Sequence, residues 1–263
     1  MTREMYLVLS IAAIGTILLV GTNLPIIANA STYTAYQGVA KTSTVRGAEG
    51  KITITSTPAL TSTANNHRDF MVFINLRNSQ SYGSGAYAYK VGSIVSVSSA
   101  QYIYDTSGIS HVINNIAVPI NTQFTSSVAQ TTQTGNCYQA KSYGSSNPLH
   151  TKCFASATYP INNVGNTAQT VPTNSGSSSN TAPAIFDFLK AGGWNPQGIF
   201  VFGDYFSSST TVEYKCANLN GYHLDRQASY SGTGSQYDKV KTGPPSTVDD
   251  CATSNTAYSP YGE

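Results

Sequence analysis

The chain has 263 residues, of which only 10% are charged, against about a quarter in an average soluble protein. The chain has 14 Lys and Arg and 12 Asp and Glu, so its net charge at pH 7 is +2, and the basic residues form no cluster in the sequence. This excludes binding to nucleic acid, because neutralising phosphates requires a concentrated positive face. Serine, threonine, asparagine, glycine and 18 tyrosines supply the polarity instead.

Residues 1–30 have the parts of an export signal: a short basic start, an apolar run over 5–20 and small residues up to Ala30. Cleavage after Ala30 is the favoured interpretation. An uncleaved membrane anchor through residues 5–27 is the alternative, since about 20 apolar residues cross a bilayer. In both cases we expect residues 31–263 to form one secreted or cell-surface domain.

Short β-strands are predicted along most of the exported part, because apolar and polar residues alternate there with a period of two. Glycines and polar turn residues separate these segments. Many short strands at this spacing predict an all-β sandwich or barrel. The predicted strands are 51–56, 69–77, 86–91, 93–98, 101–104, 111–119, 123–130, 198–206 and 211–216.

Two segments depart from the strand pattern. Residues 162–180 are rich in Asn, Thr, Ser and Gly and predict a long exposed loop. Residues 182–191 predict one short helix, since Pro183 suits a first turn and Ile185, Phe186 and Leu189 share one helical face. The predicted fold is thus a single sandwich with an N-terminal signal or anchor helix and one short internal helix.

The four cysteines all lie in the exported part, which predicts two disulfides with three pairings possible. We favour pairing between sequence neighbours, because such bonds close short hairpins or hold a tail. A cysteine metal site is the competing interpretation, but the close Cys-x-x-Cys pairs of zinc ribbons are missing. We therefore expect no metal and no other cofactor, and the favoured bonds are Cys137–Cys153 and Cys216–Cys251.

The histidines are scattered, with no carboxylate at an obvious ligand spacing, and we interpret each as a surface or structural residue. Arg68 and Asp69, beside a strand start, are expected on a solvated edge. The four histidines are His67, His111, His150 and His223.

Glu213 is the candidate catalytic residue. It lies with Asp204 on the late strand pair among aromatic residues, and it alternates with Val212 and Tyr214. If its side chain opens into a cleft, neighbouring apolar rings would raise the pKa of its carboxyl toward useful acid catalysis. An ordinary solvated glutamate is the alternative.

Tyrosines suggest a binding surface. Tyr87 and Tyr89 share one face of a predicted strand, and Tyr102 and Tyr104 share one face of the next. If the strands pair, the four rings could tile one surface on which sugars stack. Cross-strand packing of the rings, worth roughly 0.2–1 kcal/mol per pair, is the alternative.

Segments 69–91 and 198–216 carry a resemblance to known proteins. An apolar strand ending in Asn75-Leu76, a tyrosine-rich neighbour, and a Phe-x-Phe-x-Asp strand followed by Val-Glu resemble secreted concanavalin-like jelly rolls. More narrowly, they are similar to eqolisin-type glutamic peptidases. That resemblance implies a two-sheet sandwich with a Gln–Glu dyad, whose glutamate falls on Glu213. Its glutamine would fall around 86–90, where this chain has none; Gln80 is nearby.

A non-catalytic exported domain that binds a glycan or a neighbouring surface protein is the favoured function from these patterns. The alternatives are an acid hydrolase of the glutamic-peptidase type that uses Glu213, and a structural subunit of a surface layer or filament. A redox-sensitive gel mobility would test the disulfides, and cleavage of denatured protein in acid would test the hydrolase.

Overall fold

The computed structural model is all-β: the described part of the chain holds fifteen strands and no helix. It describes residues 35–42, 46–58, 60, 67–76, 80–105, 107–145, 150–154, 161–171, 183–205, 212–217, 223–229 and 236–243. The segment 1–30, with its predicted signal or anchor and the membrane span 5–27, lies outside these residues. None of the described segments forms an apolar helix of membrane-spanning length.

Seven of the strands form one antiparallel sheet, here called sheet A. Its strands, from one edge to the other, are β13 (Val212–Ala217), β1 (Ala35–Thr42), β10 (Ile161–Val171), β3 (His67–Leu76), β4 (Gln80–Val91), β5 (Ile94–Asp105) and β6 (Gly108–Ala117).

The other eight strands form sheet B. Seven of them follow one another in order, and the eighth, β12 (Phe200–Tyr205), pairs with β11 outside this order. The order in sheet B is β14 (His223–Ser229), β15 (Gln236–Gly243), β11 (Ala184–Trp194), β2 (Gly47–Ile54), β7 (Phe124–Gln130), β8 (Cys137–Lys141) and β9 (His150–Cys153); these seven and β12 make up the eight.

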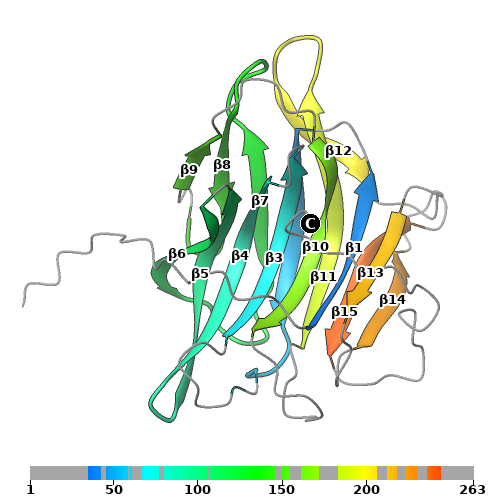
Figure 1. Cartoon of the computed structure of the whole chain (residues 1–263). Helices are drawn as coiled ribbons and strands as arrows, with labels where there is room; N and C mark the ends of the chain where they lie inside the picture. The colour runs from blue at the N-terminus through cyan, green and yellow to red at the C-terminus, as the bar shows by residue number, and fades with distance from the viewer. Residues whose placement is uncertain are drawn as a thin grey trace, which may run out of the picture.

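The two sheets lie face to face and enclose the main apolar core (Figure 1), so the predicted β-sandwich is confirmed. Ile52 and Ile54 of β2 alternate with half-buried polar residues, and both are fully buried. They belong to the same core as Phe70 and Val72 of β3 in sheet A. Since alternate residues of a strand point to opposite faces, a period of two directs one apolar set into this core.

The predicted internal helix is wrong, because residues 184–194 form strand β11. β11 pairs with β2, and its register shifts between Asp187 and Lys190, where Phe188 has a positive φ of 52°. This bulge reverses the alternation, so Phe186 and Leu189 are both buried although three positions separate them. The bulge thus reproduces the i, i+3 spacing of a helix face.

The predicted loop over 162–180 is also wrong in its first half. Strand β10 pairs with β1 on one side and β3 on the other, so it lies inside sheet A. Its Asn and Thr residues are typical of loops, but main-chain pairing along two neighbours outweighs such local preferences. Residues 172–180 lie outside the described part of the chain.

One predicted disulfide is confirmed. Cys137 and Cys153 are bonded, and they lie directly opposite each other on β8 and β9. Cys216 lies on β13, whereas Cys251 is outside the described residues, so the second bond remains a prediction. A disulfide is typical of proteins that fold in an oxidising compartment.

Replacing Cys137 and Cys153 together by serine is expected to lower the free energy of unfolding by about 3 kcal/mol, because the bond closes a short loop in the unfolded chain. For a domain of this size the melting temperature would fall by roughly 6–12 °C. Thermal unfolding followed by circular dichroism measures this shift. An unchanged melting temperature would mean that the unfolded chain is not restrained by this bond.

Tyr82 connects the two sheets through strand β9. Its hydroxyl lies 3.0 Å from Nδ1 and 3.1 Å from the backbone carbonyl oxygen of His150. Burial lowers the pKa of His150 below its ordinary value, and the nearby Lys152 ammonium lowers it further. The folded protein therefore binds a proton at His150 less readily than the unfolded chain does.

The pH dependence of stability follows from this lowered pKa. As the pH falls through about 6.5, the unfolded chain takes up a proton at this histidine that the folded protein resists, so the free energy of unfolding falls. Urea unfolding at about pH 7.5 and pH 5.5 is expected to show a smaller loss for His150→Gln than for the wild type. Equal losses in both proteins would contradict the assignment.

Candidate functional site

A group of ionisable side chains lies on the outer face of sheet A, the face turned away from sheet B. This face has an apolar cluster of its own, in which Met71 and Phe73 of β3 pack with Tyr102 of β5. His67 and Asp69 precede Met71 at steps of two along β3, so they share its face. The outer face of sheet A therefore combines apolar and ionisable groups.

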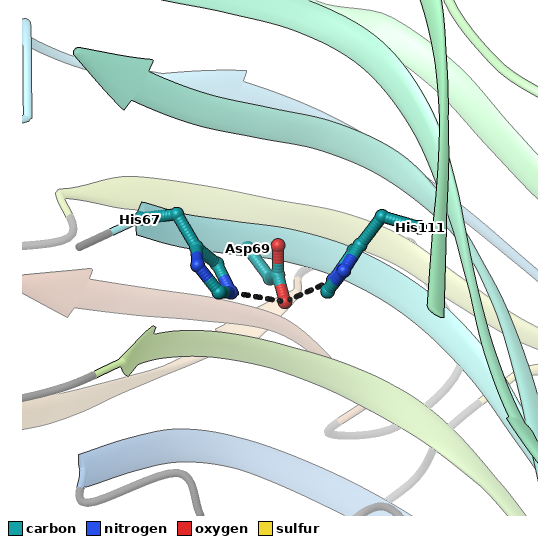
Figure 2. Close-up of side chains that lie close together, drawn as sticks. All are labelled: His67, Asp69 and His111. Carbon is teal, nitrogen blue, oxygen red and sulfur yellow. Dashed lines mark hydrogen bonds and ion pairs between the residues drawn. The ribbon is translucent and has the colours of Figure 1, made fainter. Parts of the chain in front are cut away.

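His67, Asp69 and His111, here called the His–Asp–His cluster, meet on this face. Oδ2 of Asp69 lies 2.9 Å from Nε2 of His111 and 3.7 Å from Nε2 of His67. Figure 2 shows the two imidazole rings on opposite sides of the carboxylate, each directing a ring nitrogen toward it. Two segments that are 42 residues apart in the chain thus supply one site.

The contact between Asp69 and His111 shows that the outer face of sheet A is concave. Strands β4 and β5 separate β3 from β6, so the backbones lie about 14 Å apart along the sheet. Side chains on a flat sheet would stand parallel and stay apart, whereas inward curvature directs them toward each other. An irregularity in the β5–β6 pairing between Ser98 and Ala100, with Asn115 at φ 45°, supports this bend.

Tyr87 of β4 packs against both histidines. Its ring is stacked on His67 at a centroid distance of 4.8 Å and tilted toward His111 at 4.9 Å. Burial raises the pKa of the Tyr87 hydroxyl, and the negative charges of Asp69 and Tyr89 raise it further. The hydroxyl therefore stays protonated, and the ring holds both imidazoles in place.

The whole His–Asp–His cluster is buried. Exposed fractions are 4% for His67, 0% for Asp69 and 1% for His111. Burying a carboxylate is costly unless a positive charge or hydrogen-bond donors compensate it. Two arrangements satisfy this requirement here: a hydrogen bond donated by an imidazole N–H group to the carboxylate, or a metal cation bound by all three side chains.

The sequence interpretation of these residues is corrected by the structure. Asp69 and Arg68 are fully buried inside sheet A instead of lying on a solvated edge. The His-x-Asp spacing was a usable signal only with the strand extended two residues before the predicted 69–77, because residues two positions apart on a strand share a face. His111 gave no such signal, since only the pairing of β3, β4, β5 and β6 brings it near.

The predicted tyrosine surface does not form as a row of exposed rings. Tyr102 is fully buried, and its ring occupies the space beside Gly83 on the neighbouring strand. Tyr87 pairs with Ser98, four positions along β5 from Tyr102, so the two tyrosine pairs lie at different heights of sheet A. Tyr89 is half-buried, and the side chain of Tyr104 lies outside the described part.

A pocket lies beside Tyr89, and none of the residues that line it belongs to the His–Asp–His cluster. Its volume is about 480 Å³, and Tyr89, Ser96 and Ser98 contribute to its walls. The Tyr89 ring lies 5.7 Å from the Tyr87 ring, centroid to centroid. One tyrosine thus separates this pocket from the ring that covers both histidines.

Glu213 lies on β13, at one edge of sheet A within the described strands. Its backbone pairs with Ala40, which pairs with Gly165, and the same row continues through Phe73, Gly83 and Tyr102 to His111. Five strands separate Glu213 from His111 in this order, but His67 and Asp69 lie on β3, from which only β1 and β10 separate β13, about 14 Å across the sheet. Asp69 lies four residues along β3 from Phe73, the member of this row on that strand. Glu213 and the His–Asp–His cluster therefore lie at two separate places on sheet A. The side chains of Glu213 and Asp204 lie outside the described part.

Comparisons with solved structures find distant similarities, each with a TM-score below 0.5. No family model and no curated protein matches the chain. A scytalido-glutamic peptidase structure with a transition-state analogue inhibitor aligns with a TM-score of 0.47 and 12% identity, covering 82% of this chain and 100% of that chain. A second, with a peptide-based analogue, has a TM-score of 0.44, 10% identity and the same coverage.

SCP-B, a member of the eqolisin family of peptidases in complex with the tripeptide Ala-Ile-His, aligns with a TM-score of 0.41 and 9% identity, again over 82% of this chain and 100% of that one. All three are peptidases.

Proposed function

We propose that this protein is an exported hydrolase that cleaves peptide bonds under acidic conditions, with Glu213 as its catalytic carboxylate. The observation that carries the proposal is the register around Glu213. Glu213 pairs with Ala40 on the neighbouring strand β1, and Ala40 pairs with Gly165 on β10. Lys215, two positions after Glu213, pairs with Gly38 of β1. Because glycine and alanine are the smallest residues, this register would leave space for an extended peptide beside position 213.

A glutamate suits this chemistry at low pH. Its ordinary pKa of about 4.3 means that both protonation states are populated at about pH 3–5. The carboxylate takes a proton from the attacking water, and the carboxylic acid returns it to the amide nitrogen as the carbon–nitrogen bond breaks. No metal or redox partner is required for this exchange.

The rest of the chain suits an acidic setting as well. Few side chains change charge on acidification, since charged residues make up only 10% of the sequence. Burial by itself would raise the pKa of Asp105, but hydrogen bonds from Lys152 and Ser107 lower it below the ordinary value. The ion pair between Asp105 and Lys152, 2.5 Å long, therefore persists in moderate acid and is lost only as the pH falls through that lowered pKa.

Incubating the purified chain with a denatured, unlabelled protein tests the proposal directly. We expect cleavage at about pH 3–5 and little at about pH 7, where the acid form of a glutamate is scarce. Peptide fragments identified by mass spectrometry give both the rate and the cleavage sites. Absence of fragments across this pH range would overturn the assignment.

Glycan binding is not supported by the described tyrosines. A sugar stacks on an exposed ring, whereas Tyr102 is buried and the half-buried Tyr87 ring packs against His67 and His111. The structural-subunit alternative remains a prediction, and filaments in electron micrographs of the purified chain would support it.

A further inference from the structure

We propose that His67, Asp69 and His111 bind one divalent transition-metal ion, with Zn²⁺ as the best-matched ion. The site lies on the concave outer face of sheet A and is separate from Glu213. This inference goes beyond the proposed hydrolase and does not rest on it.

The geometry of the donor atoms carries the proposal. One ligand atom from each residue lies within 4.8 Å of the other two. Bonds of 2.0–2.1 Å in a tetrahedral zinc site place neighbouring ligand atoms about 3.3 Å apart. The two distances from Asp69, 2.9 Å to His111 and 3.7 Å to His67, lie on either side of this value. The ligand nitrogens of His67 and His111 lie within 4.8 Å of each other, so completing the tetrahedral site requires them to approach by at most about 1.5 Å.

The donor set selects the class of metal. Two imidazole nitrogens and one carboxylate oxygen suit zinc and neighbouring transition metals, whereas calcium and magnesium prefer oxygen ligands throughout. Three protein ligands leave one tetrahedral position for water or a substrate atom. The site therefore has the ligand number of a metal centre that keeps an open position.

The surroundings hold the ligands in position before any metal arrives. Tyr87 stacks on one imidazole and contacts the other, so neither ring turns freely. Met71 belongs to the apolar cluster on the same face, and Tyr87 and Ile113 pack against that cluster. Such a dry environment strengthens the attraction between a cation and the Asp69 carboxylate, because water does not screen it.

A hydrogen-bonded cluster without metal is the competing interpretation, and metal content distinguishes the two. The purified full chain is incubated with Zn²⁺, dialysed against metal-free buffer and analysed by inductively coupled plasma mass spectrometry. We expect one equivalent of zinc per chain. Asp69→Asn and His111→Asn are each expected to weaken binding by about 100-fold or more in calorimetric titrations.

Two matched controls locate the metal. His150→Gln removes a histidine that contacts Tyr82 between the sheets, and Glu213→Gln removes the proposed catalytic carboxylate. Both variants are expected to bind zinc as the wild type does. If Glu213→Gln abolishes cleavage while zinc binding is unchanged, the hydrolase proposal and the zinc proposal are tested independently of each other.

Cobalt substitution keeps the test decisive if the cluster variants fail to fold. The wild-type chain with one equivalent of Co²⁺ is expected to show the intense visible bands of four-coordinate cobalt with nitrogen and oxygen ligands. The weak spectrum of hydrated cobalt, or zinc content no higher than the dialysis background, would overturn the proposal. Zinc binding that persists in folded Asp69→Asn and His111→Asn would overturn it as well.

Discussion

Glu213→Gln is expected to lower kcat/KM for a denatured protein substrate at about pH 4 by about 10³-fold or more, because proton transfer by a positioned side chain contributes 10²–10⁴-fold. Glutamine has nearly the shape of glutamate but neither accepts nor returns a proton. Binding of the peptide beside Ala40 and Gly165 would be retained, so the loss should appear in kcat more than in KM. Initial rates over a range of substrate concentrations separate the two constants.

Glu49→Gln provides the matched control. Glu49 lies on β2 in sheet B, where it accepts a hydrogen bond from Nζ of Lys190 at 3.2 Å. Its side chain is partly exposed, so its loss should cost little stability and change activity by less than about twofold. A Glu213→Gln variant that is folded and as active as Glu49→Gln would show that Glu213 is not the catalytic group.

Gly85→Ala is expected to lower the free energy of unfolding by about 3 kcal/mol or more, through overpacking. Gly85 lies on β4 and pairs with Met71 of β3 in the middle of sheet A. A Cβ atom at this position would overlap the backbone carbonyl oxygen of Phe70. Backbone cannot rotate away as a side chain does, so the β3–β4 pairing itself has to shift. Urea unfolding followed by tyrosine fluorescence measures the loss.

Gly193→Ala controls for the general effect of changing a strand glycine. Gly193 lies on β11, and an added Cβ would meet no atom within 4 Å. Replacing glycine by alanine in compatible backbone stabilises by roughly 0.4–1 kcal/mol, because the unfolded chain loses freedom. A large loss in Gly193→Ala, or none in Gly85→Ala, would contradict the close approach of β3 and β4.

The contact between His111 and Asp69 depends on the strands β4 and β5 that lie between them. Because these two strands set the distance between β3 and β6, a substitution that slips their register would separate the ligands without touching them. Gly85→Ala is therefore expected to weaken zinc binding along with stability. Zinc titration of this variant, below its unfolding midpoint, links the packing of sheet A to the His–Asp–His cluster.

Local patterns in the sequence determined the β class, the strands at 51–56 and 69–77, and the Cys137–Cys153 bond. These follow from the alternation of neighbouring residues and from cysteines that face each other across a hairpin. The strand β10 and the bulged strand β11 were hidden, because a polar strand resembles a loop and a bulge imitates helical spacing.

Only the tertiary structure decided where the ionisable groups meet. His67 and Asp69 are two positions apart on one strand, which the sequence displays, but His111 reaches them through the order of four strands and the curvature of sheet A. Such contacts depend on pairings between distant segments, and no local pattern records which strands become neighbours or how strongly their sheet bends.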